Sequence, residues 1–113
     1  MHEYSVVQAL INQCEEVARR NDATRISKVE CKIGVMSGIE IHLLKTAFDT
    51  FKEGTMCEDA DLVIWEQKLK LECLECGEVF ETEEIRYYCP HCESLRVKVL
   101  DGEEMYLMRL EMS

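Results

Sequence analysis

The stretch that decides the fold of this chain runs from residue 71 to residue 97 and reads LECLECGEVFETEEIRYYCPHCESLRV. It holds two Cys-x-x-Cys pairs, Cys73 with Cys76 and Cys89 with Cys92, with twelve residues between the pairs. The stretch has no long apolar period, and so short a segment cannot be held together by burial alone. We therefore expect the four cysteines together to stabilise the fold of this segment.

The spacing of the four cysteines favours coordination of a zinc ion. Zinc prefers four thiolates in a tetrahedron, and two Cys-x-x-Cys turns that face each other supply them. Gly77 follows the second cysteine, where such a turn needs backbone N–H groups near sulfur and little side-chain bulk. Four protein thiolates leave no open position for a substrate, so the zinc would be structural. A redox dithiol remains the alternative, although neither pair opens an amphipathic helix, as such motifs typically do.

Two amphipathic helices are predicted before the cysteine stretch. The second begins with a capping box formed by Ser37 and Glu40 and ends at Gly54. Its apolar face consists of Leu43, Leu44, Ala47, Phe48 and Phe51. In the first helix the apolar residues follow the i, i+3, i+4, i+7 spacing of one helix face, and they are Val6, Val7, Leu10, Ile11, Cys14, Val17 and Ala18.

Three strands complete the expected fold. Residues 26–34 alternate between apolar and charged side chains, which is typical of a half-buried strand, and residues 62–71 and 104–111 form the other two. A strand–helix–strand connection favours parallel neighbours, with the last strand returning antiparallel. The predicted fold class is α+β: a small three-stranded mixed sheet with two helices on one face, plus an inserted four-cysteine zinc-ribbon-like module.

Composition restricts the partners. The 113 residues include 23 acidic and 13 basic ones, which gives a formal net charge of −10. Nucleic-acid binding needs Lys and Arg to neutralise phosphates, so this charge disfavours it, and it disfavours anionic membrane surfaces as well. No uncharged stretch is long enough to span a membrane, and no signal-peptide pattern opens the chain. We expect a cytoplasmic protein.

The other three of the seven cysteines are scattered along the chain. An odd total fits poorly with a secreted disulfide framework, and a reducing compartment favours metal binding by the paired cysteines. Cys14 and Cys31 lie on apolar faces of their elements and are interpreted as small buried residues, whereas Cys57 is predicted in a loop.

The amino terminus is a second candidate metal site. The α-amine of Met1, the amide nitrogen of His2 and the His2 imidazole could close a five-membered and a six-membered chelate ring, and the Glu3 amide could add a fourth nitrogen. Ni(II) and Cu(II) prefer such a planar set of nitrogens. A histidine at position 2 is usually only a frayed terminal residue, but here the first helix begins at once and would hold it. Glu3 also suits the positive end of a helix dipole.

The opening Met1-His2-Glu3-Tyr4-Ser5, together with the paired cysteines, Gly34 and the closing strand, resembles the hydrogenase-maturation nickel metallochaperones of the HypA/HybF family. The resemblance extends over the whole chain. It implies a nickel site on Met1, His2 and Glu3. It implies a separate zinc site that consists of Cys73, Cys76, Cys89 and Cys92.

The resemblance also implies function and partners. Ni(II) would be transient cargo, delivered to the hydrogenase large-subunit precursor together with a nickel-handling GTPase. Some members resemble nickel donors for urease, so a urease accessory protein is a further implied partner. The domains would be a nickel-binding domain of residues 1–70 and 99–113 and a zinc-binding domain of residues 71–98.

Two other classes compete with this interpretation. An acidic zinc-ribbon adaptor for protein interactions, with an inert amino terminus, would bind one metal per chain, whereas a nickel chaperone would bind two of different kinds. An enzyme is the third class, and we expect none, because the sequence has no Ser/His/Asp set, no phosphate loop and no open metal site away from the terminus.

Overall fold

A computed structural model describes residues 2–83 and 87–113, without the side chains of His2 and Glu3. Contacts within the chain divide it into two compact units. The first unit consists of Met1–Lys32, Ile39–Trp65 and Tyr106–Ser113. The second unit consists of Ile33–Gly38 and Glu66–Met105, so it extends beyond the cysteine stretch on both sides and includes the start of the connection that precedes the second helix.

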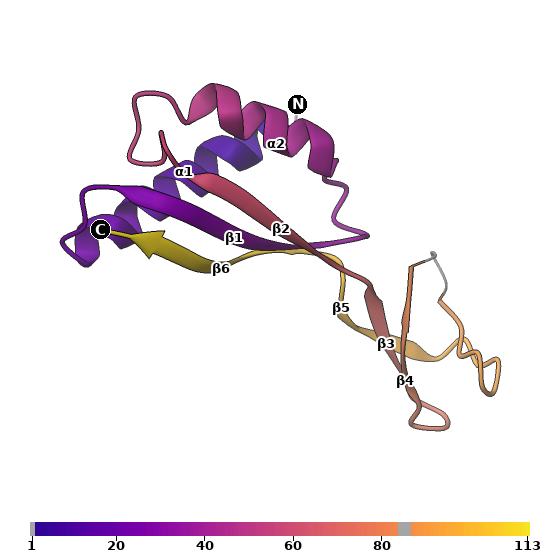
Figure 1. Cartoon of the computed structure of the whole chain (residues 1–113). Coiled ribbons are helices and arrows are strands. Elements are labelled where there is room, and N and C mark those ends of the chain that lie inside the picture. The colour runs from indigo at the N-terminus through magenta and orange to yellow at the C-terminus, as the bar shows by residue number, and fades with distance from the viewer. Residues whose placement is uncertain (1, 84–86) are drawn as a thin grey trace. The chain divides into compact units, whose positions relative to one another are not determined.

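The first sheet has the strand order β2-β1-β6, and two helices lie on one of its faces (Figure 1). Figure 1 shows β1 and β2 running in the same direction. β6 is antiparallel to β1, because Arg25 pairs with Ser113 at one end while Gly34 donates to Glu104 at the other. The predicted α+β class and mixed sheet are thereby confirmed. The elements are α1 (His2–Arg20), β1 (Ile26–Gly34), α2 (Ile41–Phe51), β2 (Asp61–Gln67) and β6 (Met105–Met112).

The core of the first unit is formed by the apolar faces of the helices against β1. The predicted face of α1 is largely confirmed, since most of its apolar side chains are buried. The face of α2 is narrower than predicted: Leu43 is 50% exposed and Phe51 is 40% exposed. Phe51 instead packs edge-on against Tyr4, with ring centroids 5.3 Å apart. The buried residues of α2 are Leu44, Ala47 and Phe48.

The start of α2 differs from the predicted capping box. Glu40, in an extended conformation, is itself the N-cap, and its carboxylate accepts the N–H of His42 at 2.8 Å. Ser37 lies in the preceding turn, where its N–H donates to the carbonyl of Gly34 at 3.0 Å. One acidic side chain can cap a helix start without a partner three residues upstream, and this is the arrangement that the chain adopts.

The second sheet has the order β4-β3-β5, with both pairs antiparallel. The predicted strand over 62–71 was wrong in one respect, because the structure divides it at Lys68 into β2 and β3. β2 belongs to the first sheet, whereas Leu71 of β3 lies opposite Phe80 on one side and Val99 on the other. The strands of this sheet are β3 (Leu69–Cys73), β4 (Val79–Thr82) and β5 (Val97–Asp101).

Gly34 and Gly102 are in close contact in the second unit, and each belongs to a different one of its two segments, residues 33–38 and 66–105. A Cβ added to Gly34 would lie 2.2 Å from the backbone of Gly102, which is closer than any real contact. The turn is fastened by hydrogen bonds from Met36 N–H to Gly102 O at 2.8 Å and from Val35 N–H to Gln67 O at 2.9 Å. The absence of a side chain at residue 34 is therefore a packing requirement.

Candidate metal centre

The structure brings the four paired cysteines together. Their sulfur atoms all lie within 4.8 Å of one another. The Sγ atoms of Cys73 and Cys92 are 3.5 Å apart, and those of Cys76 and Cys89 are 3.6 Å apart. Sulfurs at about 2.3 Å from a tetrahedral zinc would be about 3.8 Å from one another. The sulfur cluster formed by these four residues therefore fits a zinc ion in both donor type and spacing.

The first Cys-x-x-Cys turn begins where β3 ends. The N–H of Cys76 points at the sulfur of Cys73 at 3.4 Å. The N–H of Gly77 donates to the carbonyl of Cys73 at 3.0 Å, and the N–H of Cys73 donates to the carbonyl of Glu78 at 2.8 Å. The turn thus closes on its own first residue and aims a backbone dipole at the thiolate.

The second turn repeats this pattern at the same offsets. The N–H of Cys92 points at the sulfur of Cys89 at 3.4 Å. The N–H of Glu93 donates to the carbonyl of Cys89 at 2.7 Å, and the N–H of Cys89 donates to the carbonyl of Ser94 at 2.9 Å. The two turns are therefore the same local structure built from unrelated sequences.

The residue after each pair takes a left-handed conformation, with φ of +79° at Gly77 and +62° at Glu93. Glycine was anticipated at the first of these positions, but nothing in the sequence marks the second. A side chain in this conformation costs roughly 1–2 kcal/mol per residue. The repeated hydrogen-bond pattern imposes the conformation at Glu93, so the glutamate is a strained residue of the second turn.

Replacing this glutamate by glycine is expected to stabilise the second unit. Glu93→Gly should raise the free energy of unfolding by about 1 kcal/mol, because the left-handed strain is relieved. Gly77→Ala is the matched control and should lower it by about the same amount, since its Cβ would meet nothing within 4 Å and only φ is unfavourable. Urea unfolding of the metal-loaded protein measures both changes. A less stable Glu93→Gly variant would contradict the interpretation.

The sulfur of Cys73 is prepared for a metal by its surroundings. The N–H of Cys76 lowers the pKa of this thiol to about 6, against the opposing effect of burial. Cys73 and Cys89 are buried, whereas Cys76 and Cys92 are exposed. A thiol with this pKa is largely ionised at neutral pH, and the thiolate is the form that binds metal.

The amino-terminal candidate lies at the limit of the described structure. Met1 is outside the described residues, and His2 and Glu3 are described only as the backbone that begins α1. The expectation that the first helix starts at once is confirmed. The first N–H groups of a helix have no acceptor within it, so the amides at this end are not committed to helical hydrogen bonds.

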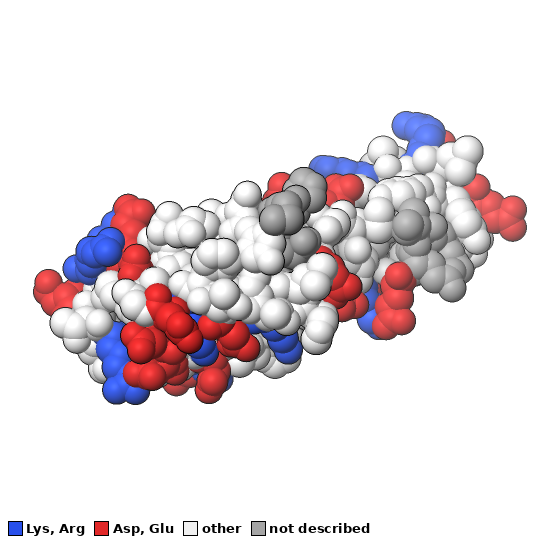
Figure 2. All heavy atoms as spheres, turned by 90° about the horizontal axis from the view of Figure 1, so that it is seen from above, with Lys and Arg blue, Asp and Glu red and all other residues white. Residues whose placement is uncertain are grey.

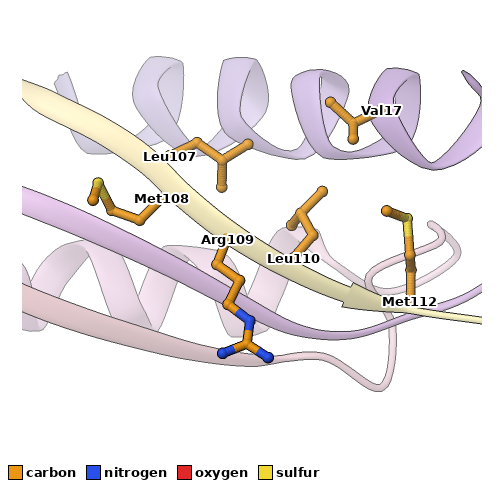
Figure 3. Close-up of a pocket in the computed structure, with 6 residues that line it drawn as sticks. All are labelled: Val17, Leu107, Met108, Arg109, Leu110 and Met112. Carbon is orange, nitrogen blue, oxygen red and sulfur yellow. The ribbon is translucent and has the colours of Figure 1, made fainter. Parts of the chain in front are cut away.

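The first unit also contains an apolar groove of about 200 Å³ between α1 and β6 (Figure 3). Leu107 and Leu110 point toward α1, and Arg109 points away from it (Figure 3). Among the described residues, no histidine, cysteine or carboxylate lines the groove, so it offers no nitrogen, thiolate or carboxylate ligand for a metal and no general base. The lining residues are Val17, Leu107, Met108, Arg109, Leu110 and Met112.

The charged side chains give a mixed surface on the helix side. Figure 2 shows acidic atoms beside basic ones, with uncharged surface between them, and no continuous basic area in that view. Ion pairs within the first unit include Arg25 with Asp59 at 3.3 Å and Lys28 with Glu111 at 3.6 Å. Among the described residues, no helix combines the length and apolar character that crossing a membrane would require.

The fold and the sulfur cluster define a small α+β protein with a four-cysteine metal centre. Over residues 1–112 the sequence matches the family described as "Hydrogenase/urease nickel incorporation, metallochaperone, hypA". The chain belongs to this HypA family of nickel metallochaperones, as its sequence motifs had indicated.

Curated relatives and solved structures agree with this assignment. Two proteins named hydrogenase maturation factor HypA, from Shewanella halifaxensis and Aquifex aeolicus, are 52% and 47% identical, and each match covers 99% of this chain and 97% of the relative. The solution structure of the Ni metallochaperone HypA from Helicobacter pylori has a TM-score of 0.73 at 42% identity, covering 97% of this chain and 96% of that one. Another solution structure, of a HypA protein, has a TM-score of 0.76 at 43% identity, covering 100% and 97%.

Proposed function

We propose that this chain binds Ni(II) at its amino terminus and delivers it to the hydrogenase large-subunit precursor. The ligands would be nitrogens of Met1, His2 and Glu3: the free α-amine, two backbone amides and the imidazole. A nickel-handling GTPase would be the working partner, and urease, through its accessory protein, a second destination. The nickel-binding domain would comprise residues 1–70 and 99–113, and the zinc-binding domain residues 71–98.

The observation that carries this proposal is the start of α1 at His2. The amides of the first helical turn lack acceptors within the helix, so committing them to a metal breaks no helical hydrogen bond. A planar set of nitrogens suits Ni(II) better than Zn(II), which prefers a tetrahedron. The two ligand types thus support two different roles. Nitrogen ligands would hold the nickel that is delivered, and sulfur ligands would hold the zinc that stays bound.

Release of the cargo follows from the same ligands. Amine, amide and imidazole nitrogens all compete with protons, so nickel affinity should fall as pH decreases. A terminal site is also open on at least one side, so a partner could replace one ligand at a time. Both routes need no rearrangement of the buried core.

The zinc site is proposed to be structural. Cys73, Cys76, Cys89 and Cys92 would supply four thiolates, which leaves no position for a substrate. Bound zinc would link the two turns of the second unit. An adaptor that binds only this metal would show one metal per chain, whereas the chaperone should bind two of different kinds.

A change at the terminus tests the proposal directly. His2→Ala, or a few residues added before Met1, should abolish stoichiometric Ni(II) binding in titration calorimetry. Loss of an outer-shell partner already costs a metal site about 10–100-fold, so loss of a ligand should weaken binding by more than about 100-fold.

The matched control is His42→Ala, because His42 is exposed on α2 and should not contribute to nickel binding. Zinc content should be unchanged in all three proteins. If stoichiometric nickel binding survives both changes at the terminus, the proposed site is wrong.

A further inference from the structure

The first sheet carries α1 and α2 on the same face (Figure 1). In β1, Val29 and Cys31 are fully buried, while Glu30 and Lys32 remain partly exposed. Because successive side chains of a strand point to opposite faces, Glu30 and Lys32 point away from the helices. We call this second side of the sheet the open face, since neither α1 nor α2 covers it.

A pocket of about 350 Å³ lies on the open face, and Glu30 connects its walls. The Glu30 carboxylate accepts the indole N–H of Trp65 in β2 at 3.4 Å, and one of its oxygens lies 3.7 Å from Nε of Arg109 in β6. The side chain of Glu30 is only 12% exposed, whereas Trp65 is 60% exposed. This carboxylate thus holds one side chain from each outer strand over the central strand. The lining residues are Glu30, Lys32, Trp65, Met108 and Arg109.

The pocket combines apolar and positively charged surface. The indole of Trp65 and the thioether of Met108 supply the apolar surface, and both residues are exposed. The lining holds two basic residues and one acidic residue, so its net charge is +1, although the chain as a whole carries −10. At physiological ionic strength charges are screened beyond about 8 Å, so the charges of the pocket outweigh distant ones for a bound group. The pocket therefore suits an apolar group with negative charge beside it.

We propose that the open face is a docking site for an acidic segment of a partner protein. One large apolar side chain of the segment sits between Trp65 and Met108, and its flanking carboxylates pair with Lys32 and Arg109. Tryptophan, methionine and arginine are enriched in protein interfaces, and tryptophan and arginine often contribute most of the binding energy. The pocket is near the lower end of the range for small-molecule sites, about 300–1,000 Å³, which suits one anchoring side chain.

A second copy of this chain is a poorer occupant of the open face. Two copies related by a two-fold axis present the same patch to each other, so Lys32 and Arg109 of one copy would approach the same residues of the other. Like charges that meet across an interface are unfavourable. The open face is therefore assigned to a different protein, and the assignment does not depend on the proposed nickel site.

Selection from a phage library of short random peptides tests the proposal. The full-length protein is the target, and phage that bind the Trp65→Ala variant are removed first. We expect an enriched consensus with one large apolar residue flanked by aspartate or glutamate. The proposal is overturned if no sequence is enriched, or if the consensus lacks either the apolar residue or the acidic ones.

Tryptophan fluorescence then locates the bound peptide, because Trp65 is the only tryptophan of the chain. A synthetic peptide of the enriched sequence, made without tryptophan, is titrated into the protein. The emission of Trp65 should shift to shorter wavelength and saturate, since the indole leaves water when the apolar side chain covers it. Binding that leaves this emission unchanged would place the peptide elsewhere and overturn the assignment.

Charge variants complete the test. Lys32→Glu should weaken binding of this peptide by at least about tenfold, because an attractive charge becomes a repulsive one. Arg25→Glu is the matched control, since Arg25 is exposed in the same unit, pairs with Asp59 and does not line the pocket. It should bind the peptide as tightly as the unchanged protein. Circular dichroism checks that both variants are folded, and their Ni(II) binding should be unchanged.

Two outcomes would contradict the choice of occupant. Equal weakening by Lys32→Glu and Arg25→Glu would show that net charge, rather than the pocket, selects the peptide. A dimer of the unchanged protein that Trp65→Ala converts into monomers, seen by analytical ultracentrifugation, would assign the open face to a second copy.

Discussion

Removing the metal from the sulfur cluster is expected to unfold the second unit and to leave the first unit folded. Within the described residues, the only apolar side chains that the second unit buries are those of Ile33, Leu69 and Leu71, besides the cysteines Cys73 and Cys89. So small a core cannot offset the conformational entropy of the segment. Structural zinc contributes of the order of 10 kcal/mol of folding free energy in comparable modules.

The measurement is a ¹H–¹⁵N correlation spectrum before and after a strong chelator. Amide signals of β3, β4 and β5 should lose their dispersion, while those of α1 and α2 should keep theirs. Cys89→Ser should reproduce the effect of the chelator. Cys31→Ser is the matched control, because this residue is also fully buried but belongs to the first unit. A second unit that stays dispersed without metal would show that burial and backbone pairing alone hold it.

Gly34→Ala is expected to destabilise the protein strongly, because backbone atoms stand where the new Cβ would lie. The new Cβ would lie 2.2 Å from the carbonyl carbon and oxygen of Gly102 and 2.7 Å from the amide nitrogen of Glu103. All three are backbone atoms, so no side-chain rotation relieves the clash. Overpacking of this kind usually costs 1–3 kcal/mol, and with only backbone to yield we expect a cost of about 3 kcal/mol or more.

Thermal or urea unfolding measures the cost. Gly38→Ala is the control, since Gly38 lies four residues on, has φ of +79° and has nothing within 4 Å of an added Cβ. It should lose only about 1 kcal/mol, through backbone strain alone. Equal stability of the two variants would mean that the backbone at residue 34 can move aside.

The helices and the sulfur cluster were predictable because their signals are local. Helix periodicity identified Leu10, Cys14 and Phe48 as core residues, and all three are buried. Cys-x-x-Cys spacing identified the four sulfurs that the structure brings together. In both cases the spacing of the residues along the sequence is itself what brings them to the same helix face or to the same metal site.

Features that depend on long-range partners were not predictable. The division at Lys68 follows from which sheet each half of the segment joins, and this depends on strands far away in the sequence. The strain at Glu93 comes from the hydrogen-bond pattern of its turn rather than from its own side chain. The hydrogen bond from the N–H of Met56 to the carboxylate of Glu15 joins residues far apart in the sequence, and no local pattern encodes it.

The membership of residues 33–38 in the second unit has a practical consequence for dissection of the protein. The polypeptide passes from one unit to the other at four places, after Lys32, Gly38, Trp65 and Met105. A fragment of residues 66–105 would lack residues 33–38, whose N–H groups donate to the carbonyls of Gln67 and Gly102. The rest of the chain would keep residues 33–38 without these acceptors. Neither unit can be isolated intact with two cuts of the chain. We therefore expect the resulting fragments to fold only when they are present together.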